Sequence, residues 1–305
     1  MMNRPDIVTL LERIAIALES IAEALGGRPP QPKLAVQTKK KIEHDLPQPA
    51  NNDTCKIVRF LEARGFQIKT IPPEQEGDST LDRIATFMGE RFGSIAELLD
   101  NIKSCMNQGS SFTLNLKNYK PQAISDVTNL CVTLYNIAFL TEYNYKNSPL
   151  FTLYAVPSTS PKALNFFAGK WLERYIKTVV LSLSQARDLN VSYLCNPQIM
   201  LPSGEDFELD MLFEAEDEVF WLESKTGDYR RHIDKYNRVS KLLKLDKAHT
   251  FLILTDPNIN DNLAEELGSI FSMTVVRIDN FAKRLEAALP APKKMLYPNA
   301  EDEQV

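Results

Sequence analysis

Apolar and polar residues alternate through residues 207–227, FELDMLFEAEDEVFWLESKTG. Side chains two positions apart lie on one face of a strand, so the pattern predicts two half-buried strands joined by an acidic turn. The first of these strands should span 207–214. Pairing of the two strands places Asp210 near Glu223 across the ladder, and Lys225 then projects to the same side as Glu223. The pattern therefore predicts two carboxylates and a lysine together at one end of a hairpin.

Residues 159–290 supply the other elements of an α/β domain around this hairpin. Apolar residues recur along one face of a predicted helix at 160–183, and the hairpin is preceded by a predicted strand at 190–201. Helices and strands then alternate along the chain, at 228–245 (helix), 249–256 (strand), 259–271 (helix), 273–279 (strand) and 280–289 (helix). This order predicts a mixed sheet flanked by helices, followed by a loose tail at 291–305.

The N-terminal residues 1–26 carry a heptad pattern. Ile and Leu recur at spacings of four, three, four, three and four, at Ile7, Leu11, Ile14, Leu18, Ile21 and Leu25. This is the a/d pattern of a coiled coil, and it predicts a homodimer or higher homo-oligomer. The alternative is a helix packed on the core of its own chain. Residues 27–52 are rich in Pro, Gln and Lys, which predicts an extended, flexible linker.

Residues 53–158 predict several helices followed by two strands, which meet at a KNSP turn. Helices followed by a hairpin are the outline of a winged-helix module. The segment is therefore either a winged-helix-like module that contacts nucleic acid or a structural, dimerising module.

Composition limits the class of protein without selecting a function. The chain has 305 residues, enough for about two domains, with 44% apolar residues and a net charge of −5. That charge excludes a strongly basic nucleic-acid coat but not a local basic groove. No apolar run reaches the ~18 residues of a membrane span, so we expect no membrane contact. The cysteines form no CxxC pair, which indicates reduced thiols in a cytoplasmic protein: Cys55, Cys105, Cys131 and Cys195.

The candidate chemistry lies at the end of the hairpin. Asp210 and Glu223 repel each other there unless a cation sits between them, and the cation could be Lys225, a metal ion or both. Hard divalent ions such as Mg²⁺ or Mn²⁺ prefer oxygen ligands, and the backbone carbonyl of Ser224 could complete the set. Glu173 in the preceding helix is a further candidate acid. The alternative is a surface strand that carries ordinary ion pairs.

A basic helix follows the hairpin. Within the predicted helix, Arg231, Lys235 and Arg238 follow the spacing i, i+4, i+7 and should share one face. A basic face beside a metal site suits the phosphate backbone of a nucleic acid, whereas the alternative is a solvated helix face. Ile233, Tyr236, Ser240 and Leu243 should form the face toward the sheet.

These residues resemble a known family. The runs GKWLERYI and GEDFELDMLFEAEDEVFWLESKTG, within residues 161–255, are similar to the PD-(D/E)XK nuclease superfamily. They look most like the nuclease domain of CRISPR ancillary nucleases that carry a ligand-sensing CARF domain, where a WLE helix precedes an ELD strand and an ECK-type strand. The resemblance matches Glu173 to the helix acid, Asp210 to the metal-binding Asp, Glu223 to the second acid and Lys225 to the catalytic lysine.

The sequence also departs from the pattern. Ser224 stands where near relatives often have Cys, and Leu209 precedes the metal-binding Asp where many members have Pro. Nothing before residue 160 has the pattern of a Rossmann-like CARF domain, so the resemblance does not imply sensing of cyclic oligonucleotides.

The resemblance implies a restriction-endonuclease-like fold and a metal-dependent endonuclease that cleaves DNA or RNA in prokaryotic defence. Mg²⁺ or Mn²⁺ would be held by Asp210, Glu223, the Ser224 carbonyl and Glu173. One alternative is a non-catalytic nucleic-acid-binding or regulatory protein on a nuclease fold. Another is a structural adaptor organised by the N-terminal coiled coil.

Overall fold

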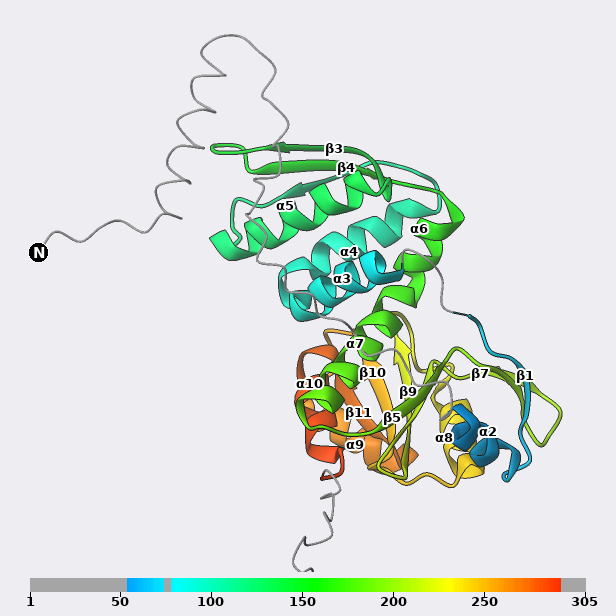
Figure 1. Cartoon of the computed structure of the whole chain (residues 1–305). Coiled ribbons are helices and arrows are strands. Elements are labelled where there is room, and N and C mark those ends of the chain that lie inside the picture. The colour runs from blue at the N-terminus through cyan, green and yellow to red at the C-terminus, as the bar shows by residue number, and fades with distance from the viewer. Residues whose placement is uncertain (1–53, 74–77, 292–305) are drawn as a thin grey trace, which may run out of the picture. The chain divides into compact units, whose positions relative to one another are not determined.

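The computed structural model describes residues 54–73 and 78–291 (Figure 1). The predicted coiled coil at 1–26, the linker at 27–52 and all but the first residue of the tail at 291–305 lie outside these residues.

A five-stranded mixed sheet forms the centre of the C-terminal region. Its strands lie in the order β11-β10-β9-β8-β5. The pairs β5/β8 and β8/β9 are antiparallel, whereas β9/β10 and β10/β11 are parallel. The strands are β5 (Val191–Cys195), β8 (Met211–Ala215), β9 (Glu218–Lys225), β10 (Thr250–Leu254) and β11 (Thr274–Arg277). The predicted mixed α/β architecture is confirmed.

Helices cover both faces of this sheet. Side chains on one face pack against α7 (Trp171–Ala186) and α10 (Ile278–Ala288). The other face packs against α8 (Ile233–Leu243) and α9 (Asp261–Phe271). All residues of β8 are consequently buried, and the prediction of half-buried strands was wrong, because both faces of the sheet lie under helices.

The hairpin β8–β9 has the predicted register. Met211 pairs with Leu222, which sets Asp210 opposite Glu223 just beyond the ladder. The two turn residues, Glu216 and Asp217, have φ of 51° and 74°. Positive φ at both central positions is the geometry of a two-residue type I′ turn, so the predicted acidic turn is confirmed.

The predicted strand 207–214 is broken in two. Its first part, β7 (Asp206–Glu208), leaves the central sheet and pairs with β6 (Gln198–Met200) in a second sheet of order β1-β6-β7, where β1 is Gln67–Thr70. The predicted strand 190–201 likewise divides into β5 and β6. The chain thus passes from the central sheet to the second sheet at two neighbouring places, Asn196 and Asp210.

The first helix that the structure describes packs against the C-terminal region of the chain. Helix α2 (Thr54–Glu62) lies against β5, and Ile57, Leu61 and Phe66 enter the same core as Trp221. Residues 54–70 therefore pack against parts of 191–275, although they precede the helices of the predicted 53–158 module.

That module otherwise contains the predicted helices and hairpin. Its helices are α3 (Asp78–Glu90), α4 (Phe92–Met106) and α5 (Pro121–Asn136), and its antiparallel sheet has the order β2-β4-β3. The strands of that sheet are β2 (Phe112–Asn115), β3 (Leu140–Lys146) and β4 (Thr152–Pro157). A winged-helix function for this module stays a prediction.

Helices α3 and α7 pack closely against each other at Gly89. A Cβ atom on Gly89 would lie 2.3 Å from the ring of Tyr175. Only glycine allows this contact, which joins the two helices beside the site described below.

The predicted helix 160–183 is interrupted. It consists of α6 (Pro161–Asn165), a π-helical turn (Phe166–Lys170) and α7. Ser160 caps the first turn by accepting a hydrogen bond from the Ala163 amide, and Pro161 occupies the first turn. Such π turns are frequent at functional sites, and this one brings Lys170 to the start of α7.

None of the helices within 54–73 and 78–291 is long and apolar enough to cross a bilayer. Cys105, Cys131 and Cys195 are free thiols.

Candidate active site

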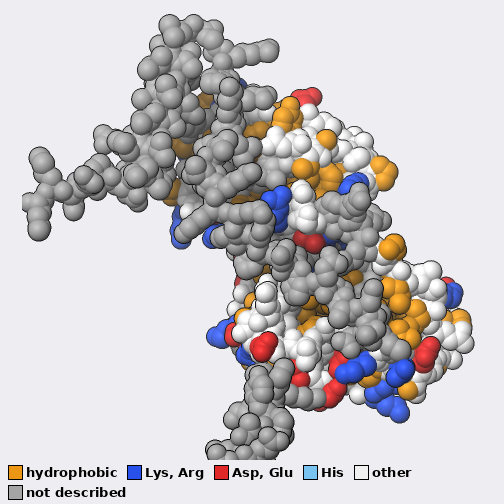
Figure 2. Space-filling model, viewed as in Figure 1, with side chains coloured by type: hydrophobic (Ala, Val, Ile, Leu, Met, Phe, Trp, Pro, Cys, Tyr) orange, Lys and Arg blue, Asp and Glu red, His pale blue; other side chains and the backbone are white. Residues whose placement is uncertain are grey.

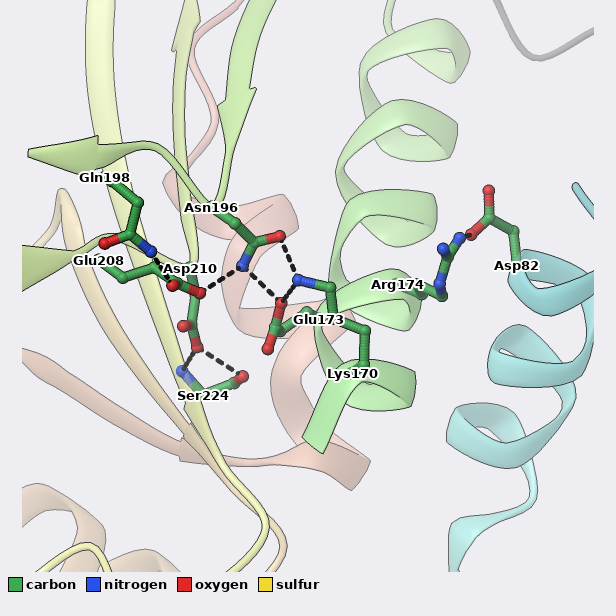
Figure 3. Close-up of polar contacts among 9 residues, drawn as sticks. All are labelled: Asp82, Lys170, Glu173, Arg174, Asn196, Gln198, Glu208, Asp210 and Ser224. Carbon is green, nitrogen blue, oxygen red and sulfur yellow. Dashed lines mark hydrogen bonds and ion pairs between the residues drawn. The ribbon is translucent and has the colours of Figure 1, made fainter. Parts of the chain in front are cut away.

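Asp210 lies where the chain passes from β7 to β8. Its carbonyl accepts a hydrogen bond from the Asn196 amide at 3.0 Å, which ties the two places where the strands diverge. Its carboxylate oxygen Oδ2 accepts from both the amide and the hydroxyl of Ser224, each at 2.8 Å (Figure 3). Ser224 therefore fixes the Asp210 side chain, a contact that the alternation along β9 did not predict.

Glu223 and Lys225 stand on β9 beside Asp210. Glu223 is 4% exposed, and its Oε1 atom lies 3.8 Å from the Lys225 ammonium. Its Oε2 atom is buried without a hydrogen-bond partner. The Lys225 ammonium also lies 5.6 Å from the centre of the Tyr236 ring on α8. The structure thus brings together the three residues that the hairpin pattern singled out.

Burial of these carboxylates perturbs their ionisation. Burial raises the pKa of Asp210 from 3.8 to about 7, and the charge of Glu173 adds to the rise, while Ser224 and Lys225 oppose it. Burial also raises the pKa of Glu223 well above its ordinary value, with a further contribution from Asp210. The Lys225 ammonium lowers that pKa. Asp210 and Glu223 are therefore both difficult to ionise, because too little positive charge lies near them.

This donor set fits a hard divalent cation. The orphaned Oε2 of Glu223 and the two perturbed carboxyls are oxygen donors that a cation would satisfy, and the Ser224 carbonyl directly follows Glu223 on β9. No three His, Cys, Asp or Glu side chains among residues 54–73 and 78–291 cluster as metal ligands. The protein would therefore contribute two carboxylates and a carbonyl, with water completing the coordination.

Glu173 is already paired with a lysine. It lies in the first turn of α7, where the helix dipole favours an acid, and its Oε2 accepts from Lys170 Nζ at 2.7 Å and from Asn196 Nδ2 at 2.6 Å. Lys170 also donates to the side-chain oxygen of Asn196, and Asn196 donates to Glu208 at 3.3 Å (Figure 3). Lys170 and Asn196 were not among the residues predicted from the sequence. The only local signal was the spacing of three between Lys170 and Glu173, which places them on one side of a helix.

The predicted basic face on α8 differs in the structure. The helix begins at Ile233, so Arg231 precedes it, because residues 229–232 form a turn. Arg231 is 85% exposed and lies 3.7 Å from Asp228. The other two predicted contacts have partners outside the site: Lys235 lies over the Phe207 ring at 4.8 Å, and Arg238 bonds to Glu205 at 2.6 Å.

The opposite face of α8 agrees with its prediction. Ile233, Tyr236, Ser240 and Leu243 are all buried.

Two cavities flank Asp210. They have volumes of about 250 Å³ and about 490 Å³, and Asn165, Lys170, Glu173 and Asp210 line both. Arg231, Lys235 and Arg238 line neither cavity. The accessible side of the site therefore faces α6 and α7 and not the basic residues of α8.

Helices α3 and α4 reach this site through one side chain each, Asp82 on α3 and Lys103 on α4. The Lys103 ammonium on α4 donates to the Thr226 carbonyl at 2.8 Å, directly after Lys225, and the Thr226 hydroxyl donates to the Ala168 carbonyl at 2.7 Å. Arg174 on α7 pairs with Asp82 on α3, and both side chains are largely buried. The module thus holds the loop that follows the candidate catalytic lysine.

Comparison with known proteins gives a likeness of fold. No protein-family model matches this sequence, and no curated protein matches it significantly. Among solved structures, protein VC1899 from Vibrio cholerae aligns with 76% of this chain at a TM-score of 0.50 and 18% identity, over 60% of its own length. Can2 from Sulfobacillus thermosulfidooxidans, solved in complex with cyclic tetra-adenylate, aligns with 77% of this chain at a TM-score of 0.51 and 17% identity, over 59% of its length. The chain therefore shares the fold of about three fifths of each of these two proteins.

Proposed function

We propose that the chain is a divalent-metal-dependent nuclease of the PD-(D/E)XK type, which hydrolyses phosphodiester bonds in DNA or RNA as part of prokaryotic defence. One observation carries the proposal: the half-buried Asp210 lies beside the buried Glu223, with perturbed ionisation and an orphaned oxygen, next to Lys225 and an open cavity. The sequence resemblance to CARF-associated nucleases and the fold shared with Can2 point in the same direction.

Each residue of the site has a role in this reaction. Mg²⁺ or Mn²⁺ bound by Asp210, Glu223 and the Ser224 carbonyl would supply a polarised phosphate and an activated water. The Lys225 ammonium would hold that water and oppose the charge that develops on the phosphate. Ser224 would keep the Asp210 carboxylate in place through its two hydrogen bonds. Glu173 would act on Lys170, since its carboxylate is bonded to that ammonium.

A second candidate is a non-catalytic nucleic-acid-binding protein on the same fold. The pairing of Glu173 with Lys170 favours it, because an internal ammonium neutralises the helix acid that the resemblance assigns to metal binding. The two candidates differ in whether cleavage depends on metal and on Asp210.

The test is incubation of labelled DNA and RNA, single- and double-stranded, with the protein in Mg²⁺, Mn²⁺ or EDTA. We expect cleavage with either metal and none with EDTA. Asp210→Asn and Lys225→Met should each lower the cleavage rate by about 10²-fold or more. Lys283→Ala, an exposed lysine on α10, is the control and should cleave normally. Cleavage by Asp210→Asn at the wild-type rate would exclude the proposed active site.

A further inference from the structure

The two cavities beside Asp210 adjoin each other, and we refer to them together, with their combined lining residues, as the trough. They share Lys170, Glu173 and Asp210, so the trough passes directly over the candidate catalytic carboxylate. One end is lined by α6 and α7, and the other by α4 and the loop that follows β9. A ligand lying along the trough would therefore contact both the α7 side of the sheet and the helical module.

The lining of the trough is basic although the chain is acidic overall. Six basic side chains line it against three acidic ones, Glu173, Asp210 and Asp228. The basic residues are Lys103, Lys162, Lys170, Arg174, Lys177 and Lys225. Figure 2 shows Lys and Arg side chains in several separate groups on the viewed face, while the whole chain has a net charge of −5. Arg174 and Lys225 lie beside Asp82 and Glu223, which do not line the trough, so the local excess of positive charge comes chiefly from Lys103, Lys162 and Lys177. Such a local excess suits a polyanion.

Two of these lysines lie on the same face of α7 and line the trough. Lys170 and Lys177 lie seven residues apart, two helical turns, and so share a face with Glu173 between them. An ammonium has three donors, and Lys170 uses two of them on Glu173 and Asn196. The third N–H remains for a ligand, and the two acceptors hold the ammonium in a fixed position. Its side chain is 30% exposed, so an incoming phosphate can reach it.

We propose that the trough binds the phosphate backbone of the nucleic-acid substrate, with Lys170 as a central phosphate ligand and Lys162 and Lys177 as contacts toward one end. This inference rests on the proposed nuclease function and names the side chains that hold its substrate. It moves the substrate path from Arg231, Lys235 and Arg238, which line neither cavity, to the face formed by α6 and α7.

The experiment measures binding without cleavage. Fluorescence anisotropy of a short labelled single-stranded DNA, and of the matching RNA, is recorded in EDTA across a salt titration. Each phosphate contact adds about 0.7 to the slope of log affinity against log salt for a single strand. Lys162→Ala/Lys177→Ala should therefore weaken binding and lower that slope by about 1.4. Lys241→Ala/Lys283→Ala removes the same charge from exposed positions outside the trough, and should change neither quantity appreciably.

Two further comparisons test which surface binds the nucleic acid and whether Lys170 contacts it directly. Arg231→Ala/Arg238→Ala should leave the slope nearly unchanged, and a larger loss for this pair than for Lys162→Ala/Lys177→Ala would overturn the proposal. Lys170→Arg keeps the charge and should retain more affinity than Lys170→Met. Equal losses for the two would show that Lys170 serves only to support Glu173.

Cleavage assays on the same proteins separate this inference from the proposed function. If the wild type cleaves but Lys162→Ala/Lys177→Ala alters neither binding nor KM, the trough assignment fails and the nuclease stands. If these variants weaken binding but the wild type cleaves nothing with Mg²⁺ or Mn²⁺, the nuclease proposal fails and the trough stands. A wild type that neither binds nor cleaves nucleic acid would overturn both.

Discussion

The substitution Asp210→Asn tests the electrostatics of the site without any substrate. It removes one ionisable carboxyl and preserves the shape of the side chain. The amide oxygen of asparagine can still accept the hydrogen bonds that Ser224 donates to Asp210. A change in the free energy of unfolding therefore reports chiefly the cost of holding a negative charge at this position.

The pKa of Asp210 sets the sign and size of the effect. Its value is raised from 3.8 to about 7 in the folded protein. The folded state thus keeps the proton to a higher pH than the unfolded chain does, and wild-type stability is lost as pH rises from about 4 to about 7. Between pH 5 and pH 8 the loss corresponds to about two pH units at 1.36 kcal/mol each, or about 3 kcal/mol. This is an upper limit, because Asp210 keeps partial exposure to solvent.

The assay is urea unfolding of both proteins in EDTA at about pH 5 and about pH 8. The stability of Asp210→Asn relative to wild type should increase by up to about 3 kcal/mol between the two values. Asp228→Asn is the control, because neighbouring groups lower the pKa of Asp228 and its removal should produce no such gain. Mg²⁺ at the higher pH should stabilise the wild type more than Asp210→Asn. A relative stability of Asp210→Asn that is constant or falls with pH would refute the reasoning.

Three further predictions concern the support of the site and self-association. Gly89→Ala should destabilise the protein by about 1–3 kcal/mol in thermal unfolding, because its Cβ would overlap the Tyr175 ring. Gly93→Ala is the control and should be neutral or stabilising, because a Cβ there meets nothing within 4 Å. Asp82→Ala should cost about 3 kcal/mol or more, since it leaves a largely buried Arg174 without that carboxylate. Glu265→Ala, which breaks exposed pairs with Lys247 and Arg284, should cost at most about 1 kcal/mol. Light scattering should show more chains per particle for the full chain than for a chain beginning at residue 51, and the same number of chains in both would exclude the predicted coiled coil.

Local patterns were enough to predict the hairpin and its carboxylates. The alternation in β8 and β9 fixed which residues face each other, and the acidic turn fixed the register, so Asp210 and Glu223 could be placed together from sequence. The same pattern did not reveal the break before Asp210. That break depends on β7 pairing with β6, which in turn pairs with β1 far earlier in the chain, and such a partnership leaves no periodic signal in residues 207–214.

The contacts of the basic residues could not be predicted from local patterns. Helical spacing suggested a phosphate-binding face on α8, but the turn before Ile233 removes Arg231 from the helix, and Arg238 is bonded to Glu205. Lys170 gave little signal, because its importance comes from Asn196, which lies on another element. Spacing along a helix predicts which residues share a face, but it does not predict what that face meets.

The site forms where the central sheet divides. At Asn196 and Asp210 the backbone leaves the five-stranded ladder, and one strand from each place continues into the second sheet. Inside the ladder, side chains of β8 are enclosed by helices on both faces, and a carboxylate there would have no access to a ligand. At the division, Asp210 can remain anchored to Ser224 while it also lines an open cavity. Asn196 has φ of 54°, a left-handed conformation that asparagine tolerates better than most residues, and from there its side chain reaches both Lys170 and Glu173. Asparagine at this position thus meets two requirements, the turn out of the sheet and the link between the strands and α7, and a larger apolar residue would meet neither.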